Sequence, residues 1–264
     1  MGRLIRMDFY RLIQSKVFWI SLLIFSGLQF ILNFFNGMFA NYNAETIADA
    51  AHKSYEWHTF NSPITEVIET PILSLFIIVL FISIVSFCHA DQANGYIKNI
   101  AGQVGDRGKI VFSKFIIIGL HNLIFFAAGA LSNVLGSLIA GVLVNEGNVF
   151  LAILTLLIKW LLSMAVSSIL LFFTVGIRNK SLGIITAVVF GANVFSLMYM
   201  GLGMAVENIF HVSVNIGDFM PDSLMGAVSV GNNELVVNGL VVSAVFIAAF
   251  LILTYIVFKK RDVK

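Results

Sequence analysis

Charged residues are scarce in this sequence. Only 11% of its 264 residues are charged, whereas a soluble domain carries about 25%. Hydrophobic residues make up 59%. So few charges exclude a soluble globular domain, because only lipid tolerates such an apolar outer surface. We therefore predict an all-α integral membrane protein that forms a single transmembrane domain over residues 1–264.

The sequence also lacks the residues of common catalytic and metal sites. Its single cysteine, Cys88, excludes an internal disulfide. Gly108 and Lys109 invite comparison with a phosphate-binding loop, but Ile110 follows where Ser or Thr would hold magnesium, and Gln103 replaces the first glycine. There is no cysteine cluster and no His-Glu-x-x-His motif. We predict no catalytic residues, no metal site and no cofactor bound by this chain.

Six apolar runs are long enough to cross a bilayer, whose core of about 30 Å needs about 20 helical residues. They cover about residues 17–40, 70–90, 115–141, 148–176, 181–204 and 235–258. The third run stays uncharged as far as Asn145, which is longer than a straight span needs. We therefore expect tilt, or a break near Gly136 or Gly141.

The gaps between these runs alternate in charge. Fourteen of the sixteen basic residues precede the first run or lie in the second gap, the fourth gap and the tail. The remaining gaps are acidic, and Lys53 is their one basic residue. Basic residues stay on the cytoplasmic side of a membrane. Six spans with both ends in the cytoplasm are therefore predicted.

Residues 1–16 are predicted to form an amphipathic interfacial helix. Ile5, Phe9, Leu12 and Ile13 share one helix face. Such a helix would lie on the inner leaflet, with its basic residues near anionic headgroups. The alternative is a positively charged flank without a defined helix.

The longest cytoplasmic piece is the second gap, residues 91–114, which we call the coupling segment. Asp91 is suited to cap a short helix, and Gly102, Gly105 and Gly108 would break it. A short helix followed by a glycine-rich turn would protrude from the membrane and press on a partner. The alternative is a simple tether.

Small residues recur at every fourth position in two runs, on faces suited to close helix packing. These faces are Ala128, Ser132, Gly136 and Ala140 in the third run, and Gly183, Ala187 and Gly191 in the fifth.

Three polar residues inside the runs are candidates for a translocation path: Lys159, Asn193 and His121. A charge such as Lys159 within a span costs at least about 2.5–3.5 kcal/mol and marks function by default. The alternative is a lysine that extends to the membrane interface, which the neighbouring Trp160 favours. For Asn193 and His121 the alternative is hydrogen bonding between helices.

Three stretches resemble the permease subunits of type-2 ABC transporters, the six-span membrane subunits of bacterial drug and peptide exporters. They are MGRLIRMDFYRLIQSKVFWI at the start, NGYIKNIAGQVGDRGKIVFSKF between the second and third runs, and FKKRDVK at the end. Their order and spacing match the family. One departure is that the family often has an acidic residue near the end of span two, where this chain offers only Asp91.

The resemblance implies a permease that is not itself an enzyme. A separate cytoplasmic ATPase, which holds ATP and magnesium, would dock on the coupling segment through Gly95, Tyr96, Ile97, Lys98, Asn99 and Arg107. A second permease, identical or paralogous, would complete the path in a bacterial cytoplasmic membrane. The cargo class implied is an amphipathic or antimicrobial peptide. An ATP-independent channel or secondary carrier, and a non-transporting sensor or scaffold, are the alternatives.

Overall fold

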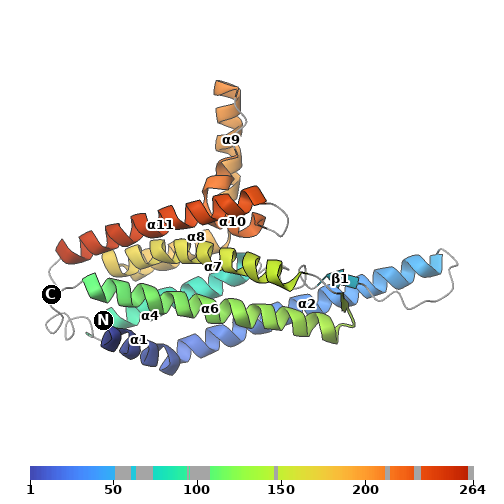
Figure 1. Cartoon of the computed structure of the whole chain (residues 1–264), viewed down its shortest axis with the longest axis horizontal. Coiled ribbons are helices and arrows are strands. Elements are labelled where there is room, and N and C mark those ends of the chain that lie inside the picture. Colours follow the sequence, from blue (N-terminus) through green and yellow to red (C-terminus); the bar gives the residue numbers. More distant parts are fainter. Residues whose placement is uncertain are drawn as a thin grey trace.

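The computed structural model is a bundle of helices (Figure 1). It describes residues 1–50, 61–63, 74–93, 95, 108–145, 148–211, 215–228 and 233–260. The main helices are α1 (Gly2–Gln14), α2 (Lys16–Ala50), α4 (Ser74–Ala93), α6 (Gly108–Ile139), α7 (Val149–Leu171), α8 (Lys180–Gly191), α9 (Ser196–Phe210) and α11 (Asn233–Lys260). Two three-residue strands, β1 (Asn61–Pro63) and β2 (Leu143–Asn145), pair in parallel. The prediction of a mainly helical membrane domain is confirmed.

Four described helices are long and apolar enough to span a membrane: Lys16–Phe39, Gly108–Ile139, Val149–Gly176 and Glu234–Lys260. A bent pair, Lys180–Gly191 with Ser196–Ile209, makes a fifth if it counts as one span. The apolar helix Phe76–Asp91 corresponds to the predicted second span but is shorter than the others, and residues 64–73 before α4 lie outside the described part. Six spans therefore stay a prediction.

The ends of the bundle separate the predicted cytoplasmic and outer gaps. Figure 1 shows α1 and the C-terminal end of α11 at one end of the bundle, and the paired strands at the other. The strands come from the first and third predicted gaps, both of which are expected outside the cell. This arrangement agrees with both termini lying on one side, although which side faces the cytoplasm stays a prediction.

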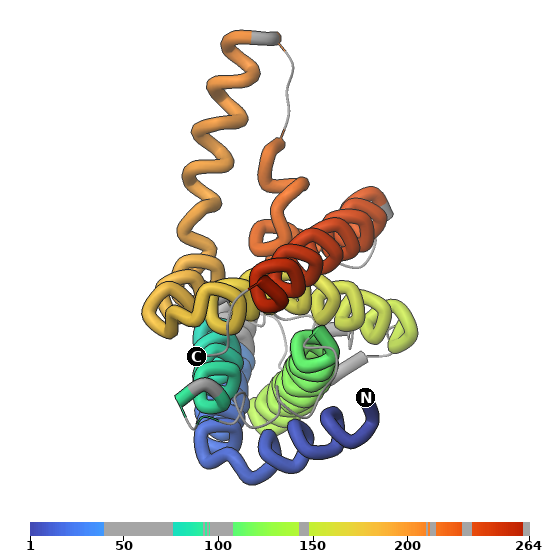
Figure 2. The backbone as a smooth tube through the Cα atoms, turned by 90° about the vertical axis from the view of Figure 1, so that its left-hand side faces the viewer, coloured from blue at the N-terminus to red at the C-terminus, as the bar shows by residue number. Residues whose placement is uncertain are grey.

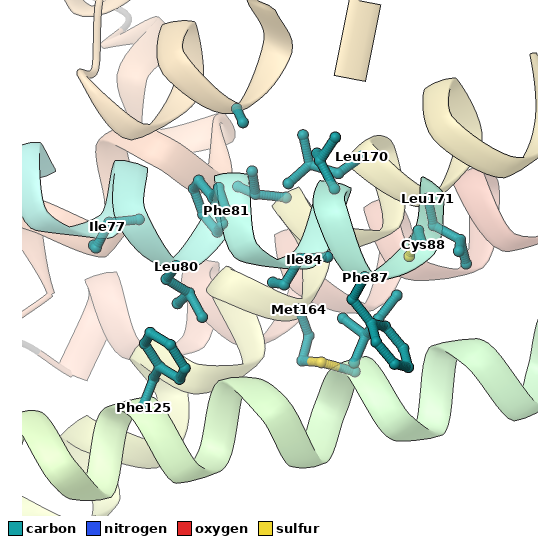
Figure 3. Close-up of a cluster of buried hydrophobic side chains, with 14 of the residues drawn as sticks. Ile77, Leu80, Phe81, Ile84, Phe87, Cys88, Phe125, Met164, Leu170 and Leu171 are labelled. Carbon is teal, nitrogen blue, oxygen red and sulfur yellow. The ribbon is translucent and has the colours of Figure 1, made fainter. Parts of the chain in front are cut away.

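The core of the bundle is built around α4. Leu80, Phe81 and Ile84 of this helix are fully buried, and Figure 3 shows them in a cluster with Phe125 of α6 and Leu170 of α7. In lipid the surrounding acyl chains are as apolar as these side chains, so the hydrophobic effect does not drive their burial. Close dispersion contacts between the side chains stabilise the bundle instead. This core holds α4 against α6 and α7.

The outer surface of the bundle is also apolar. Leu23 of α2, Leu131 of α6 and Phe150 of α7 are all largely exposed. Exposed apolar surface on this scale is a liability in water, but it suits contact with acyl chains. The low charge content of the sequence therefore corresponds to an apolar outer surface, as expected for a membrane protein.

The small residues of the fifth run form a packing face as predicted, and the structure identifies α4 as its partner. Gly183, Ala187 and Gly191 are the buried residues of α8. A Cβ atom at Gly191 would lie only 3.0 Å from the backbone nitrogen of Ile78. The α6 face is only partly buried, with Gly136 tightest, because a Cβ there would lie 2.8 Å from the carbonyl oxygen of Phe30 in α2. Both contacts depend on the absence of a side chain.

The fifth run does not form one continuous helix. It is divided by a turn at residues 192–195, and α9 leaves α8 at an angle of 66°. Asn193 in that turn has a φ of 52°, a left-handed conformation that Asn tolerates better than most residues. Figures 1 and 2 both show α9 projecting sideways from the bundle. The expected span over 181–204 is therefore bent.

The other runs end where special backbone conformations allow it. The third run stops being helical at Ile139, and Gly141 with a φ of 80° lies at the predicted break. The helix continues unbroken through Gly136. The fourth run closes with a π-helical turn, η1 (Phe172–Gly176), and a left-handed Arg178 before α8. The short elements η2 (Ile216–Phe219) and α10 (Pro221–Ala227) precede α11.

The contact between α8 and α4 gives a direct test. Gly191→Ala is expected to reduce the free energy of unfolding by about 1–3 kcal/mol, because the new methyl group meets the backbone of Ile78. The matched control is Gly201→Ala in α9, where a Cβ has nothing within 4 Å. That change should be neutral or stabilising by up to about 1 kcal/mol. Equilibrium unfolding in mixed micelles measures both, and equal effects would contradict the packing.

Candidate functional site: a buried charge cluster beside the coupling segment

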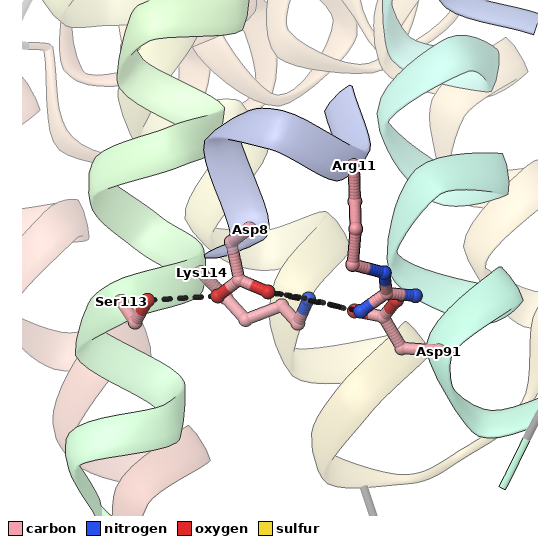
Figure 4. Close-up of polar contacts among 5 residues, drawn as sticks. All are labelled: Asp8, Arg11, Asp91, Ser113 and Lys114. Atoms are coloured by element: carbon pink, nitrogen blue, oxygen red, sulfur yellow. Dashed lines mark hydrogen bonds and ion pairs between the residues drawn. The ribbon is translucent and has the colours of Figure 1, made fainter. Parts of the chain in front are cut away.

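Four charged side chains from three helices meet at one end of the bundle. Asp8 and Arg11 come from α1, Asp91 from α4 and Lys114 from α6 (Figure 4). Lys114 Nζ lies 3.1 Å from Asp8 Oδ1 and forms an ion pair with Asp91. Arg11 also forms an ion pair with Asp91, and its Nη1 lies 3.8 Å from Asp8. We call these four residues the charge cluster.

The charge cluster is buried but balanced. The side chains of Asp91 and Lys114 have no exposed surface, Asp8 is 4% exposed and Arg11 is 23% exposed. Two carboxylates and two cations give no net formal charge. Burying an unpaired charge is very costly, so each member requires the others. The charge cluster therefore holds three helices together at one place.

Neighbouring groups complete the coordination of the charge cluster. Ser113 Oγ donates a hydrogen bond of 2.7 Å to Asp8 Oδ2, so that carboxylate is held through both oxygens. Lys114 Nζ also lies 4.9 Å from the centre of the Phe87 ring, within the range of a cation–π contact. These contacts fix the side chains of Asp8 and Lys114 in place.

Local structure brings α1 to the charge cluster. α1 ends at Gln14, and the extended backbone of Ser15, with φ −70° and ψ 117°, separates it from α2. Figure 2 shows α1 running across one side of the bundle, at an angle to the long helices. Leu12, one helical turn beyond Asp8, is fully buried beside it. The face of α1 that carries Asp8 and Leu12 therefore points into the bundle.

Two members of the charge cluster are the terminal residues of the coupling segment. Asp91 is its first residue and Lys114 its last, and their side chains are paired. Asp91 does not cap a new helix, as the sequence suggested, because α4 continues through it to Ala93. Gly108–Lys114 is likewise part of α6 and not of a free loop. Both ends of the segment are therefore anchored in helices that pair through the same ions.

The predicted ATPase-coupling residues lie between these anchors. Gly95 has a φ of 66°, a left-handed conformation that suits glycine and a change of chain direction directly after α4. The other predicted coupling residues lie outside the described part of the structure: Tyr96, Ile97, Lys98, Asn99 and Arg107. Their role stays a prediction.

The predicted amphipathic helix is present as α1, with its four apolar residues in different environments. Leu12 is buried in the core, and Ile5 packs partly against it. Phe9 and Ile13 are exposed on the outer side. The predicted apolar face is thus divided, because Leu12 and Ile5 pack with the core near buried Asp8, whereas Phe9 and Ile13 are exposed.

The three path candidates lie on different elements. His121 of α6 is fully buried, with Nε2 3.2 Å from Ser83 Oγ of α4 and its ring against Phe18 of α2. Lys159 of α7 is 8% exposed. Asn193 lies in the turn between α8 and α9, and its Oδ1 is buried without a hydrogen-bond partner among the described residues. The three residues thus come from three different elements, and a path through them stays a prediction.

Hydrogen bonds between helices account for several other polar residues in the runs. Asn122 of α6 accepts from Ser163 Oγ at 2.9 Å and donates to Ser167 Oγ at 3.0 Å, both in α7. Asn33 of α2 donates to Asn133 of α6 at 2.6 Å. Such bonds join helices where water is absent.

Sequence reasoning missed most of the charge cluster. It treated Arg11 and Lys114 as topology markers and did not use Asp8 or Ser113. The available signal was that Asp8 is the sole acidic residue among the basic residues of 1–16. A lone carboxylate in such a segment suggests a partner, but spacing alone does not say which distant residue supplies it.

Comparison with known proteins confirms the family resemblance that the sequence indicated. A family model described as ABC-2 family transporter protein matches residues 4–194, a range that contains the whole charge cluster. The chain belongs to this family. It is a type-2 ABC transporter permease, the membrane component of transport and not the ATPase. No curated protein matches the chain.

The ion balance gives a testable prediction for the permease. Lys114→Met leaves two buried carboxylates facing Arg11 alone, so the free energy of unfolding should fall by about 3–5 kcal/mol. Adding Asp91→Leu restores the charge balance and should recover at least half of that loss. A double-mutant cycle of unfolding in mixed micelles measures the coupling. Additive losses would contradict a shared, mutually neutralising cluster.

Proposed function

We propose that this permease is the membrane-spanning subunit of an ATP-driven exporter, and that the charge cluster transmits movement from a docked ATPase to the spanning helices. The observation that carries the proposal is the pairing of Asp91 with Lys114, which joins both ends of the coupling segment. A partner pressing on that segment would push on α4 and α6 together. Arg11 and Asp8 extend the connection to α1.

The buried ion pairs of the charge cluster favour transmission of the movement to the helices and disfavour a flexible segment that would absorb it. A flexible tether would bend under load, whereas a buried and fully paired ion cluster resists separation. α4 is packed into the core through Leu80, Phe81 and Ile84, and α6 is joined to α7 by the Asn122 hydrogen bonds. A push at the coupling segment would therefore shift the bundle as packed bodies, since densely packed interiors transmit strain.

The proposed docking surface is the part of the coupling segment between these anchors. It contains Tyr96 and Ile97, an aromatic and an aliphatic side chain suited to fill a pocket on a soluble partner. Lys98 and Arg107 would supply a polar rim. The permease itself lacks a phosphate loop, so energy must come from the partner, which holds ATP and magnesium.

Replacing Tyr96 and Ile97 together with Asp should abolish co-purification of the ATPase from native membranes, because two charges would enter an apolar contact. Membrane insertion should be unchanged. Quantitative mass spectrometry of the affinity-purified permease measures the bound ATPase.

The matched control is Phe219→Asp, an exposed aromatic residue in η2, within a predicted outer gap. It should leave the bound ATPase unchanged. An undiminished ATPase signal for the Tyr96 and Ile97 variant would show that the ATPase binds at another part of the permease. If unmodified permease retains no ATPase at all but still moves solute, the chain is an ATP-independent carrier.

For the translocation path we propose a role for Lys159. Its side chain is mostly buried within the bundle, which favours an internal position over extension to the membrane interface. Polar contact inside a span is maintained where it serves function. His121 and Asn193 are proposed as polar residues of the same path, although His121 also joins α4 to α6.

Lys159→Met should lower the ATPase activity of the assembled transporter by several-fold while subunit assembly persists. Lys159→Arg should be only partly tolerated, because a planar guanidinium differs in shape and donor geometry from an ammonium. The measurement is ATP turnover of the reconstituted complex in nanodiscs. Full activity of the Met variant would assign Lys159 a purely structural role.

We further propose that a second permease, identical or paralogous, completes the path and that the cargo is an amphipathic or antimicrobial peptide. The acidic character of the predicted outer gaps supports a cationic cargo, since opposite charges steer association. Described examples with exposed surface are Glu207 and Asp218, whereas Asp222 is buried. Burial raises the pKa of Asp222, while hydrogen bonds, including one from Tyr199, act in the opposite direction. Asp222 would therefore carry less charge in acid than the exposed carboxylates.

A further inference from the structure

An apolar groove runs between α1 and the bundle. It is formed by Ile5 and Phe9 of α1, by Trp160 and Met164 of α7, and by α6 residues between Phe115 and Leu123. Its volume of about 500 Å³ is within the range of about 300–1,000 Å³ that is usual for small-molecule sites. The groove thus has room for a ligand of that size.

The walls of the groove present little polarity. Trp160 donates its indole Nε1–H to the carbonyl oxygen of Gly119 at 3.0 Å, so the polar atom of that side chain is already satisfied. Gly119 brings α6 close to α7, because a Cβ there would lie 3.0 Å from Met164 Cε. The occupant must therefore offer an apolar segment to this surface.

Positive charge flanks the groove. Arg3 and Arg6 are exposed and line an adjoining hollow of α1 that shares Phe9 with the groove. Asp8, the one acidic residue of α1, is buried and paired with Lys114. The exposed part of α1 therefore carries arginines without a competing carboxylate. An occupant with an apolar chain and an anionic head complements both features.

We propose that this groove binds one acyl chain of an anionic phospholipid, whose headgroup contacts Arg3 and Arg6. The amphipathic helix would then hold a defined lipid and not merely rest on the bilayer surface. The groove lies alongside membrane-spanning helices α6 and α7, where acyl chains are the available apolar ligands. Basic residues near a membrane surface attract anionic lipid headgroups. The site is independent of the ATPase and of the cargo.

The test uses the full-length permease in detergent, with dioleoylphosphatidylglycerol and dioleoylphosphatidylcholine as probes at limiting ratio. Native mass spectrometry measures the fraction of protein that retains one lipid. We expect several-fold preferential retention of the anionic lipid. Arg3→Gln with Arg6→Gln should reduce its retention by about tenfold and leave the zwitterionic lipid unchanged. Lys259→Gln with Lys260→Gln, which removes the same charge from exposed positions in α11, should have little effect.

The groove itself is tested by filling it. Ile116→Trp adds bulk to a lining residue that is 45% exposed, and should reduce retention of both lipids at least fivefold. The control, Leu135→Trp, is on the same helix at the same 45% exposure but does not line the groove. Size-exclusion chromatography verifies that each variant is folded.

Three outcomes would overturn the proposal. One is equal retention of both lipids by the unmodified protein, and another is equal loss from Ile116→Trp and Leu135→Trp, which would mean general surface lipid. The third is that Ile116→Trp abolishes a permease dimer and leaves lipid retention unchanged, which would assign the groove to a second copy of the chain. A photoactivatable acyl chain on phosphatidylglycerol should label the α1 and α6 walls in the unmodified protein, and labelling elsewhere would count against the site.

Discussion

The electrostatic balance among Asp8, Arg11, Asp91 and Lys114 is the constraint on which this end of the helix bundle depends. The two carboxylates and Lys114 are buried within the protein, and Arg11 is partly exposed. Removing any one of them leaves an uncompensated charge, which is far costlier than losing a surface ion pair. α1, α4 and α6 must therefore keep their relative positions for the bundle to remain folded. Packing alone would allow small sliding movements that the ions do not.

The rest of the bundle is joined by interactions suited to lipid. Close backbone approach at Gly191 and Gly136 brings helices into dispersion contact, and the Asn122 and Asn33 hydrogen bonds join α6 to its neighbours on two sides. None of these draws on the exclusion of water, because the outside of the protein is apolar too. These contacts thus join the helices into one packed bundle. The bend at Asn193, where α9 turns away, is the clearest break in this regular packing.

Features that depend on composition and local sequence were predictable. The helical membrane domain follows from the low charge content, the α8 packing face from the four-residue spacing of small residues, and the end of α6 from Gly141. The charge cluster was not predictable in the same way. Its pairs between helices join residues up to 106 positions apart, as for Lys114 and Asp8. Spacing within one helix says nothing about a partner on another.

The orientation of α1 shows why hydrophobic periodicity alone was insufficient. Ile5, Phe9, Leu12 and Ile13 form the most apolar face, and in a soluble protein that whole face would be buried. In a membrane the apolar face has a second suitable environment, because acyl chains solvate it as well as a protein core does. The charged side chain of Asp8 is not solvated by lipid, but it is neutralised by its ion pair with Lys114. Asp8 therefore helps to set the rotation of the helix, which places Leu12 in the core beside it and leaves Phe9 and Ile13 exposed. The same rotation exposes the groove beside Phe9 and leaves Arg3 and Arg6 on the surface. One helix consequently has an inner face determined by ion pairing and an outer face available to lipid.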